Sequence, residues 1–171
     1  PYTPVNFKEL LVSPNDMRKR LIALINKEIK NKEQGKDAYI LAKVNHITDR
    51  ALIEKLYEAS AAGVKIELVV RGNCSLVPGV PGVSENIHIN GIIDRYLEHS
   101  RIFIFANAGE ERYYIGSADW MPRNLDNRIE VLAPVYDKEI QADLKRIVCY
   151  GFQDTAKGRI AVSYTHLRAH E

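Results

Sequence analysis

The sequence predicts an α/β fold in which a mixed sheet is flanked by helices. Over residues 7–70, strand-like and helix-like patterns alternate as strand, helix, strand, helix, strand, which is typical of a mostly parallel sheet covered by helices. Further on, the apolar runs 102–105 and 112–115 flank the turn signal Asn107-Ala108-Gly109, as in a β-hairpin. The hairpin adds antiparallel strands, so we expect a mixed sheet.

The first strand and helix are expected between residues 7 and 35. Residues 7–12 form a strand with a polar centre. Ser13 fits a helix N-cap, Pro14 fits the first helical position and Asp16 fits a capping box. Apolar residues then recur every three or four positions, which predicts a helix with one buried face. These residues are Met17, Leu21, Leu24, Ile25 and Ile29, and Gly35 ends the helix.

A second strand and helix follow. The apolar run 38–42 predicts a buried strand, and a helix starts at Thr48 and Asp49 and stops at Gly63. Its inward positions are Leu52, Ile53, Leu56 and Tyr57. Residues 64–70 are then a clear strand, followed by a loop that holds Pro78, Gly79, Pro81 and Gly82.

The chain after the hairpin supplies one more strand and one more helix. Residues 128–132 form the strand. Asp137 caps the helix and Gly151 follows it. The inward positions of this helix are predicted to be Ile140, Leu144, Ile147 and Val148.

Composition limits the classes of function. A chain of 171 residues with 46% hydrophobic residues suffices for one globular domain. The formal net charge is only +2, so any anion binding must be local rather than that of a polycation. Cys74 and Cys149 lack metal-ligand spacing and indicate a reducing compartment. With no membrane-length apolar segment and no signal peptide, the expected location is cytoplasmic.

The two ends differ from the rest of the chain. Residues 1–6 resemble a linker from an upstream domain, and there is no initiating Met. Residues 161–171 resemble translated adaptor sequence, and we interpret them as a non-native tail. The pair His166 and His170 within it is therefore not treated as a metal site.

Polar groups suited to phosphate chemistry cluster at one edge of the predicted sheet. Arg71 directly follows a buried strand, and Lys43 and Asn45 lie just past another. Ligands of open α/β sheets collect at the carboxyl ends of parallel strands. His99 precedes its strand, so it reaches the same edge only if that strand is antiparallel. A guanidinium grips phosphate through paired hydrogen bonds, and an imidazole suits phosphoryl or proton transfer near neutral pH.

The hairpin returns a second group to this edge. Arg101 follows His99 closely, and Gly116-Ser117 could present backbone N–H groups and a hydroxyl to an anion, with Asp119 as an orienting acid. Structural roles are the alternative for each: a surface Arg, a core His and a plain turn. Structural roles are expected for the remaining polar and aromatic side chains nearby. These are His46, His88, Trp120, Met121 and the charged residues Arg123, Asp126 and Arg128.

Several stretches resemble the C-terminal part of bacterial polyphosphate kinases, in order and from about residue 7 to 160. They are Lys43-Val44-Asn45, Leu56-Tyr57-Glu58-Ala59-Ser60 with Ala62-Gly63-Val64, Val70-Arg71-Gly72-Asn73-Cys74, Tyr96-Leu97-Glu98-His99-Ser100-Arg101, and Gly116-Ser117-Ala118-Asp119-Trp120-Met121-Pro122-Arg123-Asn124-Leu125-Asp126. The resemblance implies that 7–160 is the second of two phospholipase D-like α/β domains that face each other across the active site. His46-Ile47 departs from the Ser-Leu of the family.

The resemblance also implies a reaction. The family moves the terminal phosphate of ATP reversibly onto inorganic polyphosphate through a phosphohistidine. Arg71 and His99 match residues that contact the ATP phosphates, with His99 also catalytic. Lys43, Asn45, Arg101 and Ser117 are weaker candidates. The phosphorylated histidine and the Mg²⁺ site of the family lie in the preceding domain. We therefore expect no metal site in this fragment and no kinase activity from it alone.

The partners implied are ATP or ADP, inorganic polyphosphate, upstream domains of the same chain and a second copy in a homo-oligomer. Nucleic acid is not expected, and membrane association would come through the full-length enzyme. Two other functions stay open. One is a phospholipase D-type phosphodiesterase, although that group uses His-x-Lys and position 101 is Arg. The other is a non-catalytic polyanion-binding module.

Overall fold

The computed structural model describes residues 7–92, 99–153 and 158–160, and within them the strands form one eight-stranded sheet. The expected linker 1–6 and tail 161–171 lie outside the described residues. The strand order is β1-β7-β6-β5-β2-β3-β4-β8. The bounds of the strands are β1 Leu11–Ser13, β2 Tyr39–Val44, β3 Lys65–Val70, β4 Ile87–Ile92, β5 Ile102–Phe105, β6 Arg112–Gly116, β7 Glu130–Val135 and β8 Gly158–Ile160.

The sheet is mixed, as predicted. β2, β3 and β4 are parallel, while β5, β6, β7 and β1 follow on one side with antiparallel pairing, and β8 closes the other edge antiparallel to β4. The predicted hairpin is confirmed, because β5 pairs with β6 and Ile102 lies opposite Ile115. The turn between them is the 3-10 segment η1, Asn107–Gly109.

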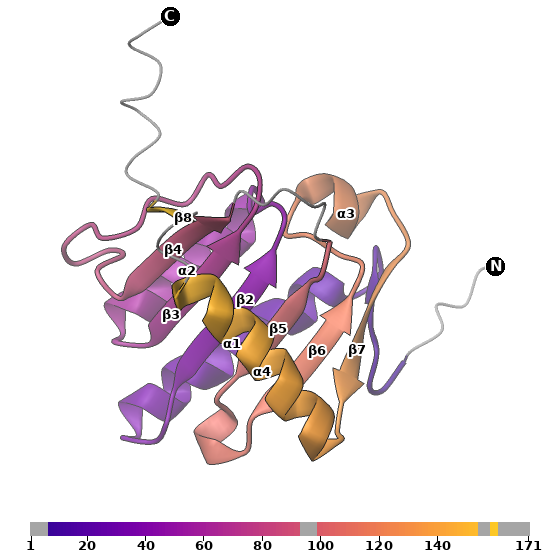
Figure 1. The fold of residues 1–171 in the computed structure, drawn as a ribbon, viewed down its shortest axis with the longest axis horizontal. Helices are drawn as coiled ribbons and strands as arrows, with labels where there is room; N and C mark the ends of the chain where they lie inside the picture. The colour runs from indigo at the N-terminus through magenta and orange to yellow at the C-terminus, as the bar shows by residue number, and fades with distance from the viewer. Residues whose placement is uncertain (1–6, 93–98, 154–157, 161–171) are drawn as a thin grey trace, which may run out of the picture.

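Helices cover both faces of the sheet (Figure 1). α1 (Met17–Glu33) and α2 (Arg50–Ala61) pack on one face, where they bury most of the apolar core. α4 (Lys138–Gln153) crosses the other face over a smaller cluster that includes Leu41, Ile104 and Val148. The short α3 (Pro122–Asp126) lies between β6 and β7 in the sequence. No helix of the described residues is long and apolar enough to cross a membrane.

The predicted start of the first helix is wrong. Ser13 belongs to β1, and its hydroxyl donates to the Arg128 carbonyl at 2.7 Å and accepts from the Glu130 N–H at 3.0 Å. The helix begins at Met17, and no side chain caps it. The local pattern assigns the Ser13 hydroxyl to a helix cap, but in the structure this hydroxyl binds backbone groups more than 110 residues away. The predicted strand at 7–12 accordingly shifts to Leu11–Ser13.

The last helix also differs from its prediction. Asp137 caps it as expected, accepting from the N–H groups of Glu139 and Ile140. The helix continues through Gly151, where a Cβ atom would lie 2.8 Å from Val69, so glycine permits a close approach to the sheet. Ile140 and Ile147 were expected to face inward but are 49% and 41% exposed. A single helix on a broad sheet face buries only a narrow strip of its own surface.

Two strands were missed, and a second predicted strand was displaced. β4 lies after the predicted loop, in a segment for which no element was predicted, although Ile87 and Ile89 alternate with polar residues and point into the core. β8 was not predicted either. The strand expected at 128–132 runs from Glu130 to Val135 instead.

The hairpin turn is anchored by a buried carboxyl group. Asn107 and Ala108 have positive φ values of 48° and 58°, a conformation that costs energy for residues other than glycine. The Asn107 N–H donates to Glu28 Oε1 at 2.7 Å. Burial raises the pKa of the Glu28 carboxyl, although hydrogen bonds from the backbone of Asn107 and Tyr39 act in the opposite direction.

Stability should therefore decrease as pH rises past the ordinary range of a glutamate. The folded state binds the Glu28 proton more tightly than the unfolded state, so deprotonation between the two pKa values costs stability. We expect Glu28→Gln to be more stable than the parent by about 1 kcal/mol at pH 7 and equal to it near pH 4. Denaturant unfolding at both pH values measures this. If Glu28→Gln lowered stability equally at pH 7 and pH 4, the prediction would be contradicted. The exposed Glu54→Gln is the control and should show no such pH dependence.

Candidate active site

Three segments meet at the edge of the sheet where β2 and β3 end. β2 and β3 are parallel, so Asn45 and Arg71, which follow them, emerge at the same edge. β5 is antiparallel to β2, with Ile102 opposite Lys43, and this brings His99 to that edge as well. The sequence argument that required an antiparallel strand before His99 could reach the site is confirmed.

His99 lies within reach of two donors. Its Nδ1 is 3.3 Å from Asn45 Nδ2 and 3.5 Å from Arg71 Nη1. A guanidinium can only donate, so this arrangement assigns Nδ1 as the acceptor and places the ring proton on Nε2. His99 is exposed, so its Nε2–H can donate to an incoming oxygen.

Asp119 is the buried anchor of this edge, with 3% of its surface exposed. Its Oδ1 accepts from the N–H of Asn45 at 2.8 Å and from the N–H of His46 at 3.3 Å. Arg101 donates to both carboxylate oxygens, through Nε at 3.2 Å and Nη2 at 3.0 Å. Arg101 Nη1 also donates to the carbonyl of His99 at 3.0 Å. One carboxylate thus ties the segment after β2 to the segment before β5.

His46 links the same segment to the one that carries Arg71. Its Nδ1 accepts from the Asn73 N–H at 2.9 Å, and the Gly72 N–H donates to the Asn45 carbonyl at 2.7 Å. A Cβ atom on Gly72 would lie 2.4 Å from the His46 ring, so the close packing requires glycine. The structural role expected for His46 is confirmed. Its support of the Arg71 segment was not predicted.

Trp120 packs beneath the site, as expected. It is fully buried and stacks on Phe103, with ring centroids 5.3 Å apart. Its carbonyl accepts from the N–H groups of Thr48 and Asp49, where α2 begins. Packing of this residue therefore sets the distance between the Asp119 segment and the start of α2.

The weaker candidates have varied surroundings. Lys43 is buried on β2. Arg101 is held by Asp119, which makes it a support rather than an open anion ligand. At Gly116-Ser117 the Ser117 N–H donates to the Val131 carbonyl at 3.2 Å and the hydroxyl accepts from the Val131 N–H, so this backbone donor is engaged within the sheet. The exposed Ser117 hydroxyl stays a predicted anion ligand.

One of the charged residues near α3, Asp126, takes part in a network with α1 and α2. Asp126 pairs with Arg18 of α1 rather than with Arg123 or Arg128. Arg18 also donates to Asp49, the N-cap of α2, and these hydrogen bonds raise its pKa. The network therefore joins α1, α2 and α3 beside the site.

No group of His, Cys, Asp or Glu side chains among the described residues could hold a metal ion. At the site itself, both oxygens of Asp119 already accept hydrogen bonds. This carboxylate is therefore not free to bind a metal ion. Mg²⁺ binding elsewhere in a longer protein stays a prediction.

Comparison with known proteins decides the family. The profile described as "Polyphosphate kinase C-terminal domain 2" matches residues 10–171. The chain belongs to this polyphosphate kinase domain family. A polyphosphate kinase of Vibrio vulnificus is 51% identical over 159 residues, which cover 93% of this chain and 23% of that protein. The chain thus spans about a quarter of the length of the relatives it matches.

Solved structures agree with the family and with the predicted fold. The polyphosphate kinase of Porphyromonas gingivalis has a TM-score of 0.90 at 44% identity, covering 95% of this chain and 25% of that chain. Nuc from Salmonella typhimurium, a phospholipase D family member, has a TM-score of 0.63 at 13% identity. It covers 91% of this chain and 97% of its own, a likeness of fold alone. The phospholipase D-like fold expected for this polyphosphate kinase domain is confirmed.

Proposed function

We propose that this chain supplies one half of the active site of a polyphosphate kinase. The whole protein would move the terminal phosphate of ATP onto inorganic polyphosphate and back. The observation that carries the proposal is the convergence of Arg71 and His99 at one exposed edge, in a chain that belongs to this family. A cation and an imidazole N–H donor at one point form a phosphate-binding pair.

The two side chains would have different tasks. Arg71 would neutralise charge that spreads over the transferring phosphoryl group. His99 would donate its Nε2–H to the oxygen that leaves with ADP, while Asn45 and Arg71 hold the ring by its other nitrogen. Asp119 and Arg101 would hold this pair in place without touching substrate.

The covalent step would occur on a histidine outside this chain. In the first half, its ring nitrogen bonds to the terminal phosphorus of ATP as the bond to the ADP oxygen breaks. In the second half, the terminal oxygen of polyphosphate displaces that nitrogen and the chain grows by one phosphate. Upstream domains of the same polypeptide are the expected source of this histidine and of Mg²⁺. We also expect a cytoplasmic enzyme that forms a homo-oligomer.

The test is ATP-dependent polyphosphate synthesis by the full-length protein that contains this chain. Arg71→Ala and His99→Ala should each lower the transfer rate by about a hundredfold, the usual scale for one preorganised donor. His88→Ala on β4 is the matched control, because this histidine is exposed and lies away from the site. The 171-residue chain alone should show no turnover. Near-normal rates in both site variants would refute the proposal.

The same variants separate the other two functions. A phosphodiesterase of the phospholipase D type would hydrolyse a generic phosphodiester. The cation of its His-x-Lys motif would be available to the substrate phosphate, whereas Arg101, at the matching position here, pairs with Asp119. A non-catalytic polyanion-binding module would bind polyphosphate equally well after His99→Ala, with affinity that falls as salt rises and no transfer by the parent. Neither has a specific geometric observation in its favour.

A further inference from the structure

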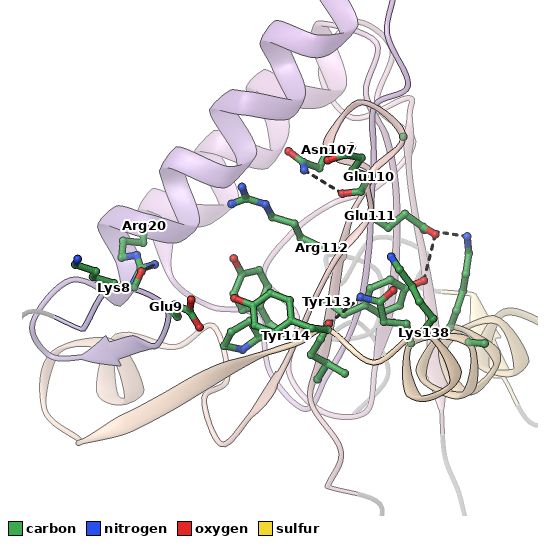
Figure 2. A pocket seen from close by; sticks show the side chains of 17 residues that line it. Lys8, Glu9, Arg20, Asn107, Glu110, Glu111, Arg112, Tyr113, Tyr114 and Lys138 are labelled. Atoms are coloured by element: carbon green, nitrogen blue, oxygen red, sulfur yellow. Dashed lines mark hydrogen bonds and ion pairs between the residues drawn. The ribbon is translucent and has the colours of Figure 1, made fainter.

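Two hollows adjoin at the end of the sheet opposite His99. The larger, of about 900 Å³, lies between the start of β6, the end of β7 and the first turns of α4 (Figure 2). The smaller, of about 550 Å³, lies beside the end of α1 and the amino ends of β2 and β3. Lys145 lines both hollows, so they adjoin at this side chain, and we call their combined lining the basic band.

The basic band concentrates positive charge. Its lining contains eight Lys or Arg residues against five Asp or Glu residues, an excess of +3. The whole chain carries 24 Lys or Arg and 22 Asp or Glu, an excess of +2. The positive excess of the chain therefore lies in this band, and the remaining surface is close to neutral.

Part of this charge is already compensated. Lys145 pairs with Glu111 at 2.9 Å, and Lys65 pairs with Glu67 at 3.0 Å. Arg20 donates to the carbonyl oxygens of residues 7, 8 and 10. Burial would raise the pKa of Glu111, but hydrogen bonds from Tyr39 and Lys145 outweigh it and keep the carboxylate charged. Lys145, Lys65 and Arg20 therefore have structural partners in the walls of the hollows, and their charge is not counted toward ligand binding.

Five cations of the band have no carboxylate partner among the described residues. They are Lys8, Lys32, Lys36, Arg112 and Lys138. The three acids that remain in the lining are Glu9, Asp37 and Glu110. In Figure 2, Arg112 extends between the side that carries Lys8 and the side that carries Lys138. Lys32 and Lys36 line the smaller hollow and the other three line the larger one, so the uncompensated cations are distributed over both hollows, which suits an extended anion.

The shape and the aromatic residues narrow the class of ligand. Tyr113 and Tyr114 line the larger hollow but are only 4% and 5% exposed, whereas Tyr136, which also lines it, is 66% exposed. One exposed ring offers a single stacking position, not the succession of rings on which the bases of a nucleic acid strand stack. A flat lipid surface would not reach cations within two concave hollows. A flexible polyanion without bases fits both features.

We propose that the basic band binds a distal segment of inorganic polyphosphate, at a second site remote from His99. This inference rests on the proposed function and deepens it. β2 has six residues, so the band lies roughly 20 Å from the His99 edge along the strands. A long polyphosphate chain can occupy both ends, whereas a chain of three phosphates cannot. The band would hold a growing chain near the enzyme between successive transfers.

The test compares long and short polyphosphate binding to the full-length protein without ATP. Arg112→Gln/Lys138→Gln should weaken binding of a chain of about a hundred phosphates roughly tenfold at low salt, and weaken tripolyphosphate binding far less. The slope of log affinity against log salt should become shallower by about 1.4, because each of the two lost cation contacts accounts for roughly 0.7 of the slope on a single-stranded polyanion. Exposed Arg50→Gln/Arg146→Gln is the control and should change neither value.

Three outcomes would overturn the proposal. Equal loss for long and short chains would place both cations at the transfer site. No loss for long chains would show that the band does not bind them. Single-stranded DNA of equal charge that competes as well as long polyphosphate would make nucleic acid the ligand. If the parent protein transfers no phosphate to polyphosphate at all, the proposed function fails. The ratio of long-chain to short-chain binding still decides whether the basic band binds polyphosphate.

Discussion

Replacing Asp119 by alanine should lower phosphate transfer by the full-length protein about a thousandfold and destabilise this domain by about 3–5 kcal/mol. Asp119 is buried and accepts four hydrogen bonds, two of them from Arg101. Its removal leaves a guanidinium that is mostly out of water without a counter-charge. It also releases the backbone N–H groups of Asn45 and His46 and the Arg101 side chain, which donates to the His99 carbonyl, so His99 loses both segments that position it.

A double-mutant cycle measures this coupling. Arg101→Ala should lower the rate less than Asp119→Ala, and the double variant should be no worse than Asp119→Ala alone, because one interaction is lost in all three. Asp119→Asn keeps an acceptor for the Asn45 N–H but turns a second donor toward Arg101, so it should recover stability more than activity. Exposed Asp143→Ala, which removes a surface ion pair with Arg146, is the control. Additive losses would contradict a shared role.

Much of the site could be predicted because topology alone brings its parts together. Strand ends place Asn45 and Arg71 at one edge, and the position of His99 before its strand requires an antiparallel neighbour. These conclusions need only the direction of each strand. They do not depend on the exact bounds of β1 or β7, which were predicted less well.

The errors share a physical cause, which is that a distant partner takes a group with a plausible local role. The Ser13 hydroxyl resembles a helix cap until β7 lies beside it, and the Ser117 N–H resembles an anion ligand until it meets Val131. The pairing of Arg101 with Asp119 is a further long-range contact that no local pattern indicates. A local pattern shows what a side chain can do, whereas sheet pairing decides which of its options remains.

The second large effect is expected at Gly116, where β6 turns toward Asp119. A Cβ atom on Gly116 would lie 2.0 Å from the Val131 carbonyl oxygen and 2.8 Å from Leu132 Cδ2. The oxygen belongs to the backbone of β7, so it cannot move aside as a side chain can. Gly116→Ala must therefore separate β7 from β6, and with it Ser117 N–H from Val131. We expect a loss of at least 3 kcal/mol, a large share of the stability of a single domain.

Gly79→Ala provides a matched comparison, because a Cβ atom there meets nothing within 4 Å. Its φ of +75° should still cost alanine about 1 kcal/mol, so the excess loss in Gly116→Ala reports the clash itself. Denaturant unfolding measures both variants. Separation of β7 also displaces the segment that carries Asp119, so any folded Gly116→Ala protein should lose phosphate transfer in the full-length enzyme as Asp119→Ala does. Equal stability losses at the two glycines would show that β7 adjusts and that this strand pair does not fix the position of Asp119.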